Sequence, residues 1–191
     1  MQTSIRRVAC LLALALCAMP TFAAVITPPA DTLKVDYFAN ANTTGAPDGT
    51  LRLTNPGTAP GNICASIFVF DPNQELTECC GCLLSPDGLR TLSVNIDIAG
   101  NPLTGVHLTT GLIEIVSTVP LAGACPMPTS ISPEPALRAW TTHVQNGSFA
   151  ETETASQDAP LSSAEVRRLT AECTGIRIGS GGGLCSCGGG D

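Results

Sequence analysis

Residues 63–98 read ICASIFVFDPNQELTECCGCLLSPDGLRTLSVNIDI, and this stretch decides the fold class. Its first eight residues, 63–70, are apolar at nearly every position, which is typical of a strand covered on both faces. Residues 71–84 are expected to form a loop that carries a cysteine cluster, and residues 86–88 (PDG) a tight turn. At 92–98, apolar and polar residues alternate, which predicts a strand with one buried and one solvated face.

Further short strands are expected on both sides of this stretch. Apolar residues at positions 33, 35 and 37 alternate with polar ones, residues 51–53 (LRL) give another short segment, and residues 111–119 (GLIEIVSTV) a longer one. The dipeptide Asn146-Gly147 predicts a hairpin, because both residue types tolerate the positive φ of a type I′ turn. Its arms are expected at 138–145 and 148–154.

Helical signals occur in one place. Residues 162–165 (SSAE) match a capping box, and Leu161 is placed to pack against Val166. Gly175 is the expected stop of a helix of about eleven residues. Ile176 and Ile178 are expected to add a last short strand.

Many short strands and a single helix favour an antiparallel β-sandwich over a parallel α/β fold. The predicted fold class is therefore mainly β: an antiparallel β-sandwich, immunoglobulin-like or related, with one short C-terminal helix and stabilising disulfides. Residues 33–178 are expected to form this single domain.

The first 23 residues have the pattern of a secretory signal peptide. Arg6 and Arg7 precede an apolar stretch too short to span a bilayer, and small residues around position 23 supply a cleavage site. An extended arm is then expected at 24–32, and a glycine-rich, cysteine-containing tail at 179–191. This organisation predicts export to the periplasm, the cell surface or the extracellular medium. No later apolar run is long enough to predict a transmembrane segment after signal cleavage.

Charge excludes one class of partner. The chain carries 9 Lys+Arg against 16 Asp+Glu, a formal charge of −7, and losing the signal peptide's two arginines takes it to −9. Lys34 is the only lysine. A nucleic-acid-binding protein needs a basic stripe to neutralise phosphates, so we expect no nucleic-acid partner. A protein partner or self-association remains compatible with this composition.

Eight of the ten cysteines follow the signal peptide, and an even number in an exported chain predicts disulfides. Adjacent cysteines rarely bond each other, so Cys79 and Cys80 are expected to reach different parts of the chain. The expected disulfide-forming residues are Cys64, Cys79, Cys80, Cys82, Cys125, Cys173, Cys185 and Cys187. Sequence alone does not choose their connectivity.

Clustered thiolates also bind soft metals such as zinc or cuprous copper. The weak candidates for such a site are Cys79, Cys80, Cys82, Cys185, Cys187 and His143. Zinc-type CxxC pairs are absent from the sequence, and disulfides are the favoured interpretation. The expected cofactor is therefore none, with a metal ion as the alternative.

Other chemical signals are weaker. The only two histidines are His107 and His143, and strand alternation places His143 on the opposite side from Trp140. The sequence contains neither a nucleophile elbow nor a phosphate-binding glycine motif. Two oxygen-rich sets resemble calcium ligands without matching an EF-hand, so both are expected to be solvated loop residues: Asp71, Asn73, Glu75 and Glu78, and Asn95, Asp97 and Asn101.

These observations predict an exported, non-enzymatic structural, cell-surface or binding protein. One version is self-assembly, in which the N-terminal arm adds as a strand to a neighbouring subunit. The alternative is a metal-binding or redox protein of the cell envelope that uses the cysteine clusters and His143.

Overall fold

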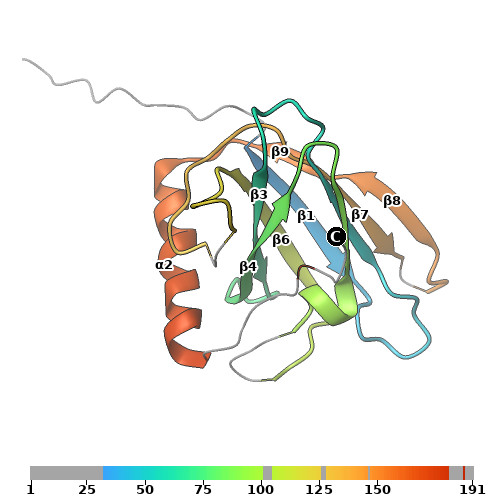
Figure 1. Cartoon of the computed structure of the whole chain (residues 1–191). Coiled ribbons are helices and arrows are strands. Elements are labelled where there is room, and N and C mark those ends of the chain that lie inside the picture. Colours follow the sequence, from blue (N-terminus) through green and yellow to red (C-terminus); the bar gives the residue numbers. More distant parts are fainter. Residues whose placement is uncertain (1–31, 101–104, 126–127, 146, 181–186, 188–191) are drawn as a thin grey trace, which may run out of the picture.

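The computed structural model describes residues 32–100, 105–125, 128–145, 147–180 and 187. Two antiparallel sheets build the domain (Figure 1). The first sheet has the spatial order β4 (Leu76–Leu84), β3 (Ile63–Phe70), β6 (Thr110–Thr118), β1 (Leu33–Ala39) and β9 (Gln157–Ala159). The second has the order β5 (Leu89–Ser93), β2 (Thr50–Thr54), β7 (Arg138–Val144) and β8 (Glu151–Ala155). The expected mainly β, sandwich-like fold is confirmed.

A single α-helix of the described residues, α2 (Ser163–Ser180), packs on the outer face of the first sheet (Figure 1). The domain therefore has three layers: second sheet, first sheet and helix. Every residue of β3 is buried, because alternate side chains of this strand enter different cores. Ile67 lies in the core between the sheets, whereas Phe68 lies in the core beneath the helix. This is why β3 is apolar at consecutive positions, as expected for a strand covered on both faces.

The structure confirms a hairpin in this region, but the predicted two-residue turn was wrong, because the Gln145 N–H bonds to the carbonyl of Ala150 rather than pairing with residue 148. β7 pairs with β8 in antiparallel register from Trp140↔Ala155 to Val144↔Glu151. Gly147 has a φ of 85° in the connection, a conformation that glycine adopts without a steric penalty. Asn146 lies outside the described residues.

The expectation of a loop over residues 71–84 was wrong for most of that segment. Only the residues before Leu76 form a turn, in which the Asp71 carboxylate accepts hydrogen bonds from the backbone N–H groups of Asn73 and Glu75. Residues 76–84 form β4, which pairs with β3 along its length. Its cysteines pack as small apolar residues on both faces of the strand, a role that alternation of larger hydrophobic residues does not reveal.

The predicted strand over 92–98 was wrong for five of its seven residues. β5 ends at Ser93, and Val94–Ile98 forms a short π-helical turn, η1. The Ser93 hydroxyl accepts a hydrogen bond from the Ile96 N–H, and the Asp97 carboxylate accepts one from the Ser93 N–H. Local side-chain bonds of this kind compete with strand pairing. Ile96 is consequently 83% exposed, although the alternating pattern predicts that it is buried.

The helix is longer than expected. Its N-terminus is as predicted, since the Ser162 hydroxyl accepts a hydrogen bond from the Glu165 N–H. Neither the stop at Gly175 nor the final strand at Ile176 and Ile178 occurs, because the helix continues to Ser180. Burial explains the continuation: Ile176 packs with the sheet in the core beneath the helix.

The signal peptide (1–23), most of the arm and most of the tail lie outside the described residues. Thr32, at the end of the predicted arm, is fully buried, and its carbonyl accepts a hydrogen bond from Ser117. Among the described helices, none is both long and apolar enough to cross a membrane.

Candidate functional site

The cysteines fasten peripheral segments to the β3–β4 hairpin. Three disulfides join Cys64 to Cys125, Cys79 to Cys173 and Cys82 to Cys187, with Cα–Cα distances of 5.6, 5.9 and 5.4 Å. These distances lie within the usual range for disulfides. Cys80 is also disulfide-bonded, and its partner lies outside the described residues, as does the candidate Cys185.

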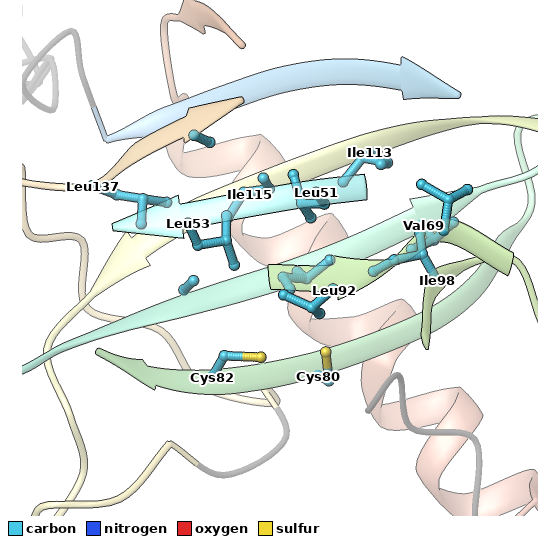
Figure 2. Packing of buried hydrophobic residues seen from close by; sticks show 14 of the residues in the cluster. Leu51, Leu53, Val69, Cys80, Cys82, Leu92, Ile98, Ile113, Ile115 and Leu137 are labelled. Atoms are coloured by element: carbon cyan, nitrogen blue, oxygen red, sulfur yellow. The ribbon is translucent and has the colours of Figure 1, made fainter. Parts of the chain in front are cut away.

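Neighbouring cysteines of β4 point in opposite directions. Cys79 faces the helix and bonds to it through Cys173, whereas Cys80 and Cys82 face the core between the sheets (Figure 2). The Sγ atoms of Cys80, Cys82 and Cys187 all lie within 4.8 Å of one another. The structure thus gathers three of the candidate metal ligands and separates Cys79 from them. In the oxidised form these sulfurs are disulfide sulfurs, and the thiolate is the form that binds metals.

His143 is not part of this sulfur cluster. Its Nε2 atom forms a hydrogen bond of 2.7 Å with the Thr154 hydroxyl and lies 3.4 Å from Asp36 Oδ1. The Tyr37 ring stacks on the imidazole with the ring centroids 4.2 Å apart. The Ser156 hydroxyl donates a 2.6 Å hydrogen bond to the other oxygen of Asp36. These contacts tie β1 to β7 and β8. The other histidine, His107, is exposed.

The His143 cluster does not have the arrangement of a catalytic triad. In a triad, the carboxylate holds the imidazole Nδ1–H while Nε2 faces the nucleophile. Here both Asp36 and Thr154 lie at Nε2, and Nδ1 is buried without a hydrogen-bond partner. The hydroxyl of Ser156 is directed to the carboxylate rather than to the imidazole. The geometry therefore supports a structural role for these groups.

The two oxygen-rich sets do not converge on a common point. Asp71 uses its carboxylate within its own turn, and Asp97 accepts from Ser93. Asn95 uses its side-chain oxygen to accept a hydrogen bond from the Asn42 N–H, while Asn101 lies outside the described residues. Glu78 lies apart from Asp71, buried on the inner face of β4. Burial, opposed by a hydrogen bond from the Gly100 backbone and reinforced by the charge of Asp97, raises the pKa of Glu78 to about 8.

A pocket between the helix and the first sheet is the main feature that the sequence did not predict. It has a volume of about 520 Å³. Its lining combines apolar and charged side chains: Phe70, Asp71, Gln74, Leu112, Glu114, Arg168 and Glu172.

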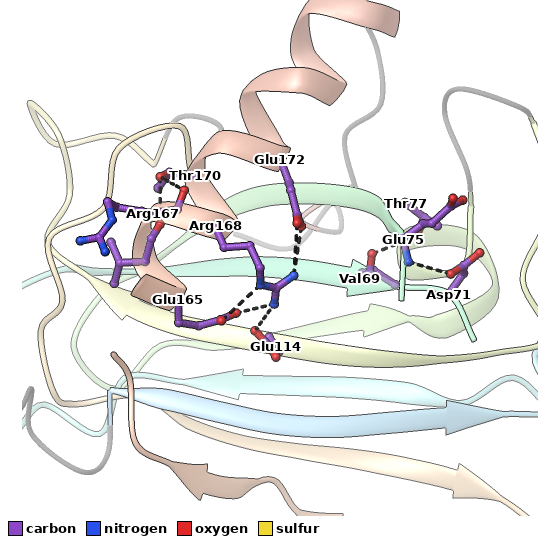
Figure 3. Close-up of polar contacts among 11 residues, drawn as sticks. Val69, Asp71, Glu75, Thr77, Glu114, Glu165, Arg167, Arg168, Thr170 and Glu172 are labelled. Carbon is purple, nitrogen blue, oxygen red and sulfur yellow. Dashed lines mark hydrogen bonds and ion pairs between the residues drawn. The ribbon is translucent and has the colours of Figure 1, made fainter. Parts of the chain in front are cut away.

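Arg168 lies at the centre of the charged groups in and beside this pocket (Figure 3). Its guanidinium pairs with Glu165 and, at 3.1 Å, with Glu172, and it lies 3.8 Å from Glu114 Oε2. Its Cζ atom is 4.8 Å from the centre of the Phe70 ring, in cation–π contact. One guanidinium therefore faces three carboxyl groups.

Glu114 is the buried member of this group. Only 13% of its side chain is exposed, and its Oε2 atom has no hydrogen-bond partner. Burial raises the pKa of Glu114 to about 7, with a further increase from the charge of Glu165 and a partial opposing effect from Arg168. A carboxyl group with this pKa exchanges protons near neutral pH.

One sequence signal could have indicated this pocket. Glu114 is the only charged residue in the apolar segment 111–119, and Glu165, Arg168 and Glu172 have the spacing of one helix face. Sequence alone does not show that this helix face meets that strand. Comparisons with protein-family models, curated proteins and solved structures found no match to this chain.

Proposed function

We propose that this chain is an exported, non-enzymatic structural or binding module that acts outside the cytoplasm. The observation that carries the proposal is the state of the cysteines. All seven cysteines of the described residues are disulfide-bonded, and disulfides persist in oxidising compartments. The signal-peptide pattern at 1–23 supports the same compartment.

The distribution of the bridges supports a function that depends on a stable fold. The bridges hold the 121–125 loop, the helix and residue 187 to two adjacent strands. Each native bridge in a domain of this kind stabilises the fold by roughly 2–4 kcal/mol. Within the described part of the chain, the groups around His143 do not have the geometry of a triad. A stable fold is therefore the property that these residues support best.

Self-assembly through the N-terminal arm is the specific version that we propose. The arm leads directly into β1, and β8 offers an edge in which all five residues are exposed. Exposed edges of this type accept an added strand in many assemblies. The arm is short of charge, so its pairing with an edge would depend on backbone hydrogen bonds.

Deletion of residues 24–31 tests this version. The deletion stops before Thr32 because that residue is buried in the domain. Light scattering of the exported protein should show assemblies for the full mature chain and monomers for the deletion variant. A Gly-Ser replacement of the same eight residues serves as the control for length, and it should also be monomeric. An unchanged assembly size in the deletion variant would overturn the proposal of arm-mediated assembly.

The alternative, a metal-binding or redox role, is favoured by one observation, the close grouping of the Cys80, Cys82 and Cys187 sulfurs. It requires that these sulfurs be thiolates in the working protein. Intact mass before and after reduction separates the two functions. A mass deficit of about 8 Da, two hydrogens for each of four bridges, supports the structural module. A smaller deficit, or the added mass of a metal, supports the alternative.

A further inference from the structure

The only lysine of the chain lies inside the sandwich, opposite an aspartate. Lys34 on β1 is the cross-strand partner of Asp158 on β9, and the Lys34 Nζ atom contacts Asp158 Oδ1. The Lys34 side chain is only 4% exposed, whereas that of Asp158 is 55% exposed. We propose that these two side chains condense to an amide, which links the first and last strands of the domain covalently.

Lys34 lies in a buried, apolar part of the first sheet. On the other side of β1, the cross-strand neighbour of Lys34 is the fully buried Ile115. An ammonium group in such surroundings depends on its one carboxylate partner, and transfer of a charge out of water carries a large penalty. Condensation replaces an ammonium and a carboxylate by one neutral amide. The exposed side of Asp158 gives the released water a path to solvent.

A second carboxyl group lies on the same strand as Lys34. Asp36 lies two residues beyond Lys34 on β1, on the same face, and is 7% exposed. The hydroxyl of Ser156, the residue just before β9, donates a hydrogen bond to the Oδ2 atom of Asp36. Residues two apart on one strand lie roughly 6–7 Å apart at Cα and share a face, a separation that the long Lys34 side chain spans. The groups that face Asp36 are Ser156, the Tyr37 N–H and His143.

The reaction balances without an oxidant, a reductant or another reactant. Lys34 first transfers a proton to Asp158, which gives an amine and a carboxylic acid. The amine nitrogen attacks Cγ of Asp158, and the new N–C bond forms. Asp36 takes the second proton from the nitrogen and delivers it to the leaving hydroxyl group, so the C–O bond breaks and water departs. The sum is an ammonium and a carboxylate converted into an amide and one water.

This inference goes beyond the proposed function, because the amide closes the domain whether or not the chain assembles. Residues 34 and 158 are 124 positions apart. A bond between them would encircle most of the sandwich and would survive conditions that reduce the disulfides.

Intact mass of the fully reduced mature protein in denaturant is the deciding measurement. We expect a mass below that of the sequence by one water, about 18 Da. Tryptic peptides should contain the segments around Lys34 and Asp158 joined together, with no cleavage after Lys34 and normal cleavage after Arg52. The full sequence mass together with cleavage after Lys34 would show an ordinary ion pair and overturn the proposal.

Two variants separate loss of the amide from loss of folding. Lys34→Arg retains a positive charge for Asp158 but lacks the nucleophilic amine, so it should fold and show the full mass. Asp36→Asn should retain Lys34 and Asp158 and yet remain largely unlinked. An equal loss of water in Lys34→Arg would place the dehydration elsewhere in the chain, and full linkage in Asp36→Asn would remove Asp36 from the mechanism.

Discussion

Glu78 and Gly100 lie directly against each other at one end of the inter-sheet core. The Gly100 backbone forms a hydrogen bond with the Glu78 side chain, and a Cβ atom at position 100 would overlap Glu78 Oε1. Glu78 is 7% exposed. Glycine at position 100 leaves room for the Glu78 carboxyl group in its present position, and burial there gives a carboxyl group that holds its proton to an unusually high pH.

The first prediction concerns this carboxyl group. The pKa of Glu78 is about 8 in the folded state against about 4.5 for an ordinary glutamate. The folded state thus binds the proton more tightly, so this contribution to stability is complete at acidic pH and is lost as the pH rises through about 8. Glu78→Gln should remove a loss of stability on the order of 4 kcal/mol between about pH 5 and about pH 8. Chemical denaturation across this range measures it, and Glu75→Gln, at an exposed turn position, should leave the slope unchanged.

The second prediction concerns Arg168 and Glu114. Arg168 lowers the pKa of Glu114, while burial and Glu165 raise it to about 7. Arg168→Met should therefore raise the pKa of Glu114 further, because two negative neighbours then act without compensation. Titration of the glutamate carboxyl groups by NMR measures the shift. The matched control is Arg167→Met on the exposed side of the helix, and an equal shift in that variant would contradict the assigned pairing.

The third prediction concerns close packing at Gly111. A Cβ atom at this position would lie 2.6 Å from the Phe70 carbonyl oxygen and 2.7 Å from Phe38 Cζ. One of these neighbours is backbone and the other is a fully buried ring, so neither can move at low cost. Gly111→Ala should lower the free energy of unfolding by roughly 1–3 kcal/mol. Gly175→Ala is the control, because nothing lies within 4 Å of the added atom, and it should be neutral or stabilising.

The fourth prediction concerns the bridge between the helix and the sheet. Replacing Cys79 and Cys173 together by alanine should lower the free energy of unfolding by roughly 2–4 kcal/mol. The helix should also become the first segment to exchange its amide hydrogens, because only the apolar core around Leu169 and Ile176 and the contacts of Arg168 with Glu114 and Phe70 then hold it. Replacement of Cys64 and Cys125 should leave helix exchange unaltered. Equal protection of the helix in both double variants would show that packing alone holds it.

The sequence predicted local structure correctly where the pattern of residues had a single physical cause. Residues 63–70 are apolar on both faces because both faces are covered, and glycine at position 147 suits the positive φ found there in the β7–β8 connection. The pattern failed where another interaction competed with it. Ser93 and Asp97 bind the backbone and end β5 early, while the cysteines of β4 pack as core residues that an alternation rule does not count.

The candidate sites were less predictable because they depend on contacts between distant segments. The cysteines were predicted as disulfide-forming residues, but the choice of Cys173 for Cys79 requires knowing which face of β4 meets the helix. The Glu114 pocket depends on the same contact, and His143 acquires its partners from β1 and β8.

The placement of the bridges also fixes an order of events during synthesis. Cys64, Cys79 and Cys82 emerge early in one hairpin, yet their partners follow 61, 94 and 105 residues later. During that interval the hairpin carries closely spaced cysteines whose native partners have not yet been synthesised. Correct oxidation therefore has to wait for the last part of the chain, or to undo earlier pairings by thiol–disulfide exchange. A chain that stops short of residue 173 would leave Cys79 and Cys82 of the hairpin without their native partners.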